Sequence, residues 1–270
     1  MSSVQRIIKY LALALSFLLT LSIISIIVYG ALMISNIFNR EDVDTSGDVR
    51  LLGEFEKVSI LNIDIDSSNI EIKIGDGFRV ETSNKYIELR EDNKEIYVTE
   101  KKHNWFTSKN VSNLVIYAPH DVLLERVDIN SGAGTVDMEE LLTEKLNFDL
   151  GTGTVNINNL NVLNTAKIDG GVGEININNS SLNNLKLNIG VGKFTMKARI
   201  SGNSEIDHGI GEASLNLMGE KNNYQIHVDK GIGSLTIDGN EAKDDYAYGN
   251  GIDRIDINGG MGRISINFME

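Results

Sequence analysis

The sequence predicts an all-β protein: a β-solenoid of about 20-residue Gly-x-Gly coils with an irregular β-rich N-terminal cap, preceded by one transmembrane helix. Three observations predict this class. A Gly-x-Gly pattern occurs seven times in the second half of the chain, apolar and polar residues alternate around each copy, and an uncharged apolar run lies near the N-terminus. A short fixed repeat is typical of stacked units, because one unit cannot bury its own apolar face.

The apolar run covers residues 10–38 and follows a short basic tail, residues 1–9. About 20 apolar residues in a helix suffice to cross a bilayer core. A cleaved signal peptide is the alternative, but the run exceeds the roughly 7–15 apolar residues of such a peptide, so we expect an uncleaved anchor. A basic tail before a retained apolar run favours a single-pass protein of the cell membrane, anchored through this helix, with its C-terminal domain extracellular.

Residues 39–53 form a charged linker, and residues 54–125 are β-rich without a fixed period. Residues 63–74 alternate like a degenerate first coil, with Asp66 at the Asn/Asp position that recurs in the later coils. We expect residues 54–125 to cap the solenoid, because terminal repeats must present a soluble outer face.

The solenoid repeats occupy residues 126–270, and successive copies start 19, 20, 19, 19, 22 and 29 residues apart. Alternation on both sides of each Gly-x-Gly predicts two half-buried strands joined at a bend, where glycine supplies the backbone freedom. The long last spacing predicts a polar loop over residues 238–250. The turn glycines are Gly132, Gly134, Gly151, Gly153, Gly171, Gly173, Gly190, Gly192, Gly209, Gly211, Gly231, Gly233, Gly260 and Gly262.

Two residues before each first glycine the chain always has Asn or Asp. This Asx column contains Asn130, Asp149, Asp169, Asn188, Asp207, Asp229 and Asn258. A hydrogen-bonded turn ladder is the favoured interpretation, because Asn and Asp serve it equally well. A cation site is the alternative: coils stacked in chain order would place Asp149 beside Asp169, and Asp207 beside Asp229, with carboxylates about 5 Å apart. No metal is therefore predicted, and these four aspartates are the candidates if one binds.

Composition and charge exclude several classes of partner. The net charge of −13 disfavours nucleic acid and anionic lipid surfaces. The chain contains no cysteine, so disulfides and a lipid-modified cysteine are excluded.

The residues offer no clear catalytic constellation. The four histidines, at positions 103, 120, 208 and 227, are scattered and indicate surface residues rather than metal ligands. The same aspartate pairs have the spacing of a retaining glycosidase, but the repeats lack the aromatic platforms that sugar clefts usually present. We therefore predict no enzyme and no cofactor.

The last coil ends at Phe268, two residues before the chain stops. If this coil ends the stack, its backbone forms an open edge from Ile264 to Phe268. The loop of residues 238–250 is one candidate cover for this edge. Pairing with a second solenoid or a partner strand is the other, which predicts self-association through the C-terminal coil.

The order of these features carries a family resemblance. An N-terminal anchor, the segment Asp66 to Ile72, a strand ending Ile116 to Pro119 and Gly-x-Gly coils together resemble the bacterial β-strand-repeat domain named "putative adhesin", over about Leu52 to Phe268. The resemblance implies a surface or envelope role, with some relatives near envelope-stress regulators, and it transfers no catalytic residues.

These observations favour a membrane-anchored, non-enzymatic binding or adhesion-like module of the cell envelope, with an envelope protein or a glycan as partner and a role in envelope-stress sensing. Two alternatives stay open. One is a membrane-bound cytoskeletal scaffold that polymerises end to end, and the less favoured one is a carbohydrate-active β-helix enzyme.

Overall fold

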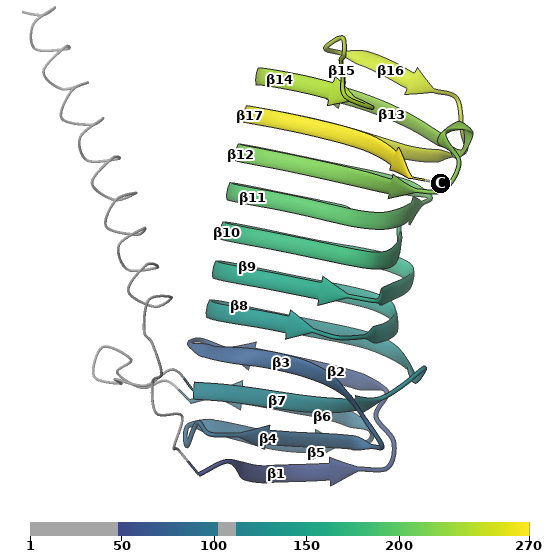
Figure 1. The fold of residues 1–270 in the computed structure, drawn as a ribbon. Helices are drawn as coiled ribbons and strands as arrows, with labels where there is room; N and C mark the ends of the chain where they lie inside the picture. The colour runs from purple at the N-terminus through teal and green to yellow at the C-terminus, as the bar shows by residue number, and fades with distance from the viewer. Residues whose placement is uncertain (1–47, 102–111, 270) are drawn as a thin grey trace, which may run out of the picture. The chain divides into compact units, whose positions relative to one another are not determined.

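The computed structural model describes residues 48–101 and 112–269. Within them, strands β1 to β17 form one continuous 17-stranded sheet that winds into a stack of coils (Figure 1). Besides strands and turns, the described residues contain a short 3-10 helix at Lys221–Asn223. The prediction of an all-β, solenoid-like fold is confirmed.

The predicted basic tail, the transmembrane anchor of residues 10–38 and most of the linker lie outside the described residues. In the part that the structure describes, no helix has the length and apolar character needed to cross a membrane. The first strand, β1 (Arg50–Phe55), begins within the segment predicted as linker.

Five consecutive long strands form the regular centre of the stack. They are β8 (Leu123–Met138), β9 (Leu141–Asn158), β10 (Leu160–Asn183), β11 (Lys186–Ser201) and β12 (Asn203–Met218). Each pairs in parallel with the next, and the register aligns the repeats: Gly173 pairs with Gly153 on one side and with Gly192 on the other. Equivalent side chains therefore stack on one another, about 4.8 Å apart.

The C-terminal strand lies inside the stack and not at its end. The strands concerned are β13 (Tyr224–Asp229), β14 (Ile232–Ile237) and β17 (Asp253–Met269). β17 pairs with β12 on one side and with β13 and β14 on the other (Figure 1). The expectation of an open edge from Ile264 to Phe268 is wrong, because Ile264 pairs with both Ala213 and Leu235.

The N-terminal coil is inserted in the same way. The strands concerned are β2 (Ile60–Ile65), β3 (Ser68–Gly75), β6 (Glu95–Glu100) and β7 (Ser112–Pro119). β2 and β3 pair with β8 on one side and with β6 and β7 on the other. Asp64 pairs with Asn130 and so belongs to the Asx column. The placement of Asp66 there is wrong, because Asp66 takes the position of the first glycine, next to Gly132.

Antiparallel strands close both ends of the parallel stack. The closing strands are β4 (Phe78–Thr82), β5 (Ile87–Asp92), β15 (Asn240–Glu241) and β16 (Tyr246–Gly249). β4 pairs with β7 and β1, and β5 pairs with β6. At the other end, β16 pairs with β13, and β15 pairs with β14. The segment predicted as a polar loop therefore covers the edge of the terminal coil, which limits edge-to-edge association.

The core runs along the axis of the stack. Its central column lies three residues before each first glycine, and every member is at most 2% exposed: Ile129, Phe148, Ile168, Leu187, Ile206, Ile257 and Val228. Burial of such apolar columns is the main stabilising contribution to a stacked fold. Three buried side-chain polar atoms among the described residues have no hydrogen-bond partner: Arg79 Nε, which lies 3.1 Å from the Glu81 carboxylate, Ser131 Oγ and His208 Nε2.

Candidate binding surface

The Gly-x-Gly bends align into one corner of the solenoid. The second glycine of each copy has a positive φ, from 137° at Gly211 to 158° at Gly233. L side chains rarely adopt this conformation. A Cβ at Gly192 would also overlap the carbonyl oxygen of Gly173 on the neighbouring coil. Only the middle residue of each Gly-x-Gly therefore carries a side chain at the corner.

These middle residues form an exposed apolar ridge over five adjacent coils. We define the corner ridge as Val172, Val191, Ile210, Met261 and Ile232, from β10, β11, β12, β17 and β14 in their order along the stack. Their exposure ranges from 39% at Val191 to 70% at Ile232. In the two preceding coils the same position holds Ala133 and Thr152.

The sequence analysis missed this ridge, although the signal is present. The signal lies in the residues between the two glycines of each copy and not in the columns on either side. Aligned, these residues change from Ala133 and Thr152 to five large apolar side chains.

A ladder of alternating charges follows the ridge on one side. The charge ladder consists of Glu174, Lys193, Glu212 and Arg263, which pair in register across β10, β11, β12 and β17. Lys193 Nζ lies 3.5 Å from Glu174 Oε1, and Arg263 Nη1 lies 3.6 Å from Glu212 Oε1. These ion pairs are solvent-exposed, so each contributes little to stability.

The Asx column follows the ridge on the other side as a hydrogen-bonded ladder. In spatial order it runs Asp64, Asn130, Asp149, Asp169, Asn188, Asp207, Asn258 and Asp229. The Asn188 amide donates to Asp169, and the Asn258 amide donates to Asp207 at 2.7 Å. The expectation that Asp207 stacks beside Asp229 is wrong, because Asn258 of the inserted β17 lies between them.

Asp149 and Asp169 do lie side by side, as a register pair on β9 and β10, and each shifts the pKa of the other. Burial raises the pKa of Asp149, and the hydrogen bond with Asp169 raises it further. Burial alone would also raise the pKa of Asp169, but hydrogen bonds with Lys167, Asn188 and Asp149 lower it. The two pKa values are shifted in opposite directions, so the pair loses its protons in two separate steps, with Asp169 ionising at the lower pH.

This pair borders a shallow groove of about 540 Å³ that extends over β2, β8, β9 and β10. The lining consists of Asx-ladder residues, Asp66, glycines and small or aliphatic side chains, without an aromatic residue. A retaining glycosidase needs its two carboxyl groups about 5–5.5 Å apart, with the sugar between them. The groove beside this pair has no aromatic platform on which a sugar could stack, so the lining gives this chemistry no support.

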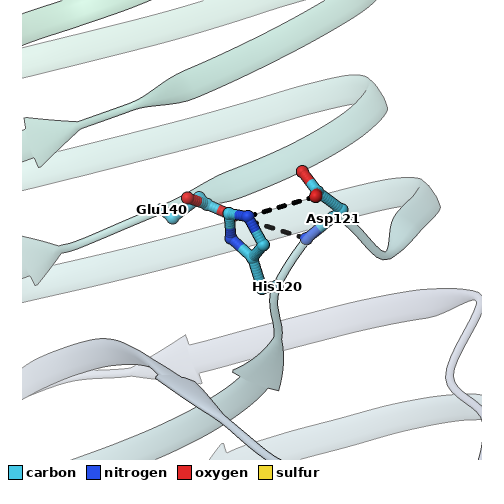
Figure 2. Close-up of side chains that lie close together, drawn as sticks. All are labelled: His120, Asp121 and Glu140. Atoms are coloured by element: carbon cyan, nitrogen blue, oxygen red, sulfur yellow. Dashed lines mark hydrogen bonds and ion pairs between the residues drawn. The ribbon is translucent and has the colours of Figure 1, made fainter.

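A second polar cluster lies at the turn between β7 and β8, where Figure 2 shows His120 between Asp121 and Glu140. His120 Nδ1 lies 2.5 Å from Glu140 Oε1, and His120 Nε2 lies 3.1 Å from Asp121 Oδ2. One potential ligand atom from each of the three residues lies within 4.8 Å of the other two, so the three could hold a metal ion. His120 and Asp121 are exposed, and such acidic surface groups also occur without an ion.

The scattered positions of the histidines predict unrelated surface residues, whereas the structure places His120 in this cluster. The signal for the His120 cluster was the separation of 20 residues between positions 120 and 140, which is one coil. His227 Nε2 lies 3.1 Å from Asp245 Oδ1, whereas His208 is buried in the core. Burial lowers the pKa of His208, although a hydrogen bond with the Gly192 backbone opposes this effect. His103 lies outside the described residues.

In-register coils, closed ends and an outward-facing corner define a β-solenoid repeat protein. Residues 58–249 match the family model described as Toastrack DUF4097, and the chain belongs to this family. The resemblance to the "putative adhesin" repeat domain is thereby confirmed.

Three solved structures are similar to the chain at low sequence identity. A "putative cell adhesion protein" from Clostridium sporogenes is 16% identical, with 82% of this chain and 99% of that chain covered and a TM-score of 0.38. A "putative adhesin" from Bacteroides fragilis is 12% identical, covering 83% and 100%, with a TM-score of 0.41. A "putative lipid binding protein" from Parabacteroides distasonis is 13% identical, covering 83% and 96%, with a TM-score of 0.40. None of the curated proteins matches the chain.

Proposed function

We propose that this chain is a membrane-anchored, non-enzymatic binding module of the bacterial cell envelope, and that it binds its partner through the corner ridge. The apolar run of residues 10–38 supports the anchor. The solenoid follows this run and extends from the outer face of the membrane. A module of this kind suits adhesion-like contacts or the sensing of envelope stress, because its long rigid stack holds a binding surface in a fixed orientation.

The observation that carries the proposal is the corner ridge. Its five large apolar side chains stack on adjacent coils and are each more than a third exposed. Contiguous exposed apolar surface with polar borders marks interaction sites in soluble domains. In the described part of the chain, the ridge side chains stand exposed at a corner of the solenoid and line no pocket, which suits contact with another macromolecule better than capture of a small molecule.

The chemistry of the ridge favours a protein partner over a glycan. Valine, isoleucine and methionine offer no flat ring on which a sugar can stack. The bordering charge ladder and Asx ladder supply alternating donors and acceptors, which suit the polar rim of a protein–protein interface.

The scaffold alternative requires coils to stack end to end between molecules. Antiparallel strands close both ends of the described stack, which disfavours such contact. The enzyme alternative rests on aspartate pairs, of which only Asp149 and Asp169 are adjacent. No specific observation in the described residues supports either the scaffold or the enzyme alternative.

Site-specific photo-cross-linking in intact cells tests the proposed function. A photoreactive residue replaces Ile210 of the ridge or, as the matched control, Leu163 of β10, which is 42% exposed and lies about half a coil before the ridge residue Val172. We expect adducts from position 210 and not from position 163. Equal adduct yields at positions 210 and 163 would show that the ridge is not the binding surface.

A further inference from the structure

The two ladders that border the corner ridge share a property that the ridge alone does not have. From β10 through β11 and β12 to β17, the charge ladder alternates between acidic and basic residues. Over the same four strands, the Asx ladder alternates Asp169, Asn188, Asp207 and Asn258. When a series of four alternating residues is laid against a reversed copy of itself, each residue of one kind faces a residue of the other kind. Each ladder therefore matches a reversed copy of itself.

A two-fold axis supplies this reversal if it lies across the ridge, between β11 and β12. Such an axis inverts the direction of the stack and keeps each ladder on its own side of the ridge. It places Lys193 opposite Glu212 of a second copy, and Glu174 opposite Arg263 of that copy. In the Asx ladder, it places Asn188 opposite Asp207, so each amide faces a carboxylate.

The same axis matches apolar residues along the ridge. Val191 of one copy faces Ile210 of the other, and Val172 faces Met261. At the edge of the contact, Ile232 faces Thr152. The first unfavourable pair is Asp149 against Asp229, which lies at the rim, where solvent screens the repulsion. A parallel arrangement about an axis along the stack would instead bring the charge ladder against the Asx ladder and lose this match.

We infer that the partner of the corner ridge is a second copy of this chain, packed antiparallel with its axis between β11 and β12. This inference rests on the proposed function and names the partner. The ridge spans four coil-to-coil steps, about 19 Å. A contact of this size is weak in dilute solution, but anchoring in one membrane or in facing membranes raises the effective concentration of the copies.

Disulfide formation between single-cysteine variants tests the geometry, because the chain has no cysteine of its own. The full chain carrying Val172→Cys is co-expressed with the full chain carrying Met261→Cys, and isolated membranes are oxidised with copper phenanthroline. The proposed axis brings positions 172 and 261 together and separates the two copies of position 172 by about three coils, or 14 Å. We expect the mixed disulfide, and little product from either variant alone.

Charge reversal tests whether the ladder sets the pairing. Lys193→Glu on both copies should reduce the mixed disulfide at least about fivefold, because two like-charged pairs then face each other. Adding Glu212→Lys should restore the yield to within about twofold. Within one chain, the single and the double variant each have two like-charged neighbours, so an intrachain effect would not be rescued. Ala133→Lys, exposed at the same corner position beyond the contact, is the matched control.

The outcomes separate this inference from the proposed function. Absence of the mixed disulfide, a product between two copies of position 172, or no rescue by the double variant would overturn the inference. A ridge adduct with a different protein would overturn it as well, while the proposed function stands. Protection of Ile210→Cys from a maleimide when the full chain is reconstituted in phosphatidylcholine vesicles, without any mixed disulfide, would assign the ridge to a lipid surface.

Discussion

The side-chain amide of Asn258 donates a hydrogen bond of 2.7 Å to Asp207, 51 residues earlier in the chain. This bond exists because β17 lies between β12 and the terminal coil formed by β13 and β14. Because β2 and β3 are inserted in the same way at the other end, the first and last coils of the chain each have a neighbour on both sides. Neither coil forms an open edge.

This order predicts which cysteine pairs form disulfides within one chain. Asp207→Cys with Asn258→Cys should form an intramolecular disulfide, because adjacent parallel strands bring the two Cα atoms to about 5 Å. Asp207→Cys with Asp229→Cys should not, because β17 separates them. Peptide mapping of the oxidised protein by mass spectrometry gives the answer. A disulfide only between positions 207 and 229 would show that β17 lies at the end of the stack and not next to β12.

Substitution of Gly192 by alanine should destabilise the protein by about 3 kcal/mol, the upper end of backbone-strain costs. Its φ of 147° disfavours any side chain, and a Cβ would displace the backbone of Gly173. Val191→Ala at the adjacent exposed position should change the free energy of unfolding by no more than about 0.5 kcal/mol. Urea unfolding of both variants measures the difference. Equal stabilities would show that the corner does not depend on glycine.

The sequence predicted the repeating part of this fold because every coil carries the same local pattern. Gly-x-Gly between alternating residues specifies a bend between strands, and the buried columns follow from that alternation. The spatial order of the coils could not be predicted in this way. Asn258 and Asp229 both belong to the Asx column, so the local pattern does not decide which of them stacks on Asp207, and tertiary pairing makes the choice. The corner ridge was readable from the residues between the glycines, whereas its exposure followed only from the fold.

His208 should make the protein sensitive to mild acid. Burial lowers its pKa from the ordinary value of 6.5, so below that pH the unfolded chain binds a proton that the folded chain does not. Stability is therefore full above pH 6.5 and falls as the pH decreases toward the folded pKa. His208→Leu, with an apolar residue like its neighbour Ile189, should reduce the drop in melting temperature between pH 7 and pH 5. An unchanged drop, equal to that of the exposed control His227→Asn, would count against this role.

Asp149→Asn should raise the melting temperature at pH 7. The pKa of Asp149 is raised, so its favourable contribution is present below its unfolded pKa and is lost as the pH rises through the folded value. At neutral pH an asparagine can instead donate to Asp169, as Asn188 does from the other side. The gain should shrink at pH 4. If millimolar calcium stabilised the unaltered chain and not this variant, the pair would be a cation site.

Cysteine labelling at two corner positions tests the central claim, that the solenoid presents an occupied corner ridge outside the cell membrane. Full chains carrying Ala133→Cys or Ile210→Cys are treated in intact cells with a membrane-impermeant maleimide, and again after dilution of the purified proteins. Position 133 should be labelled in intact cells, position 210 should be protected there, and both should react equally when purified and dilute. Labelling of position 133 only after lysis, or equal labelling of both positions in intact cells, would contradict the account.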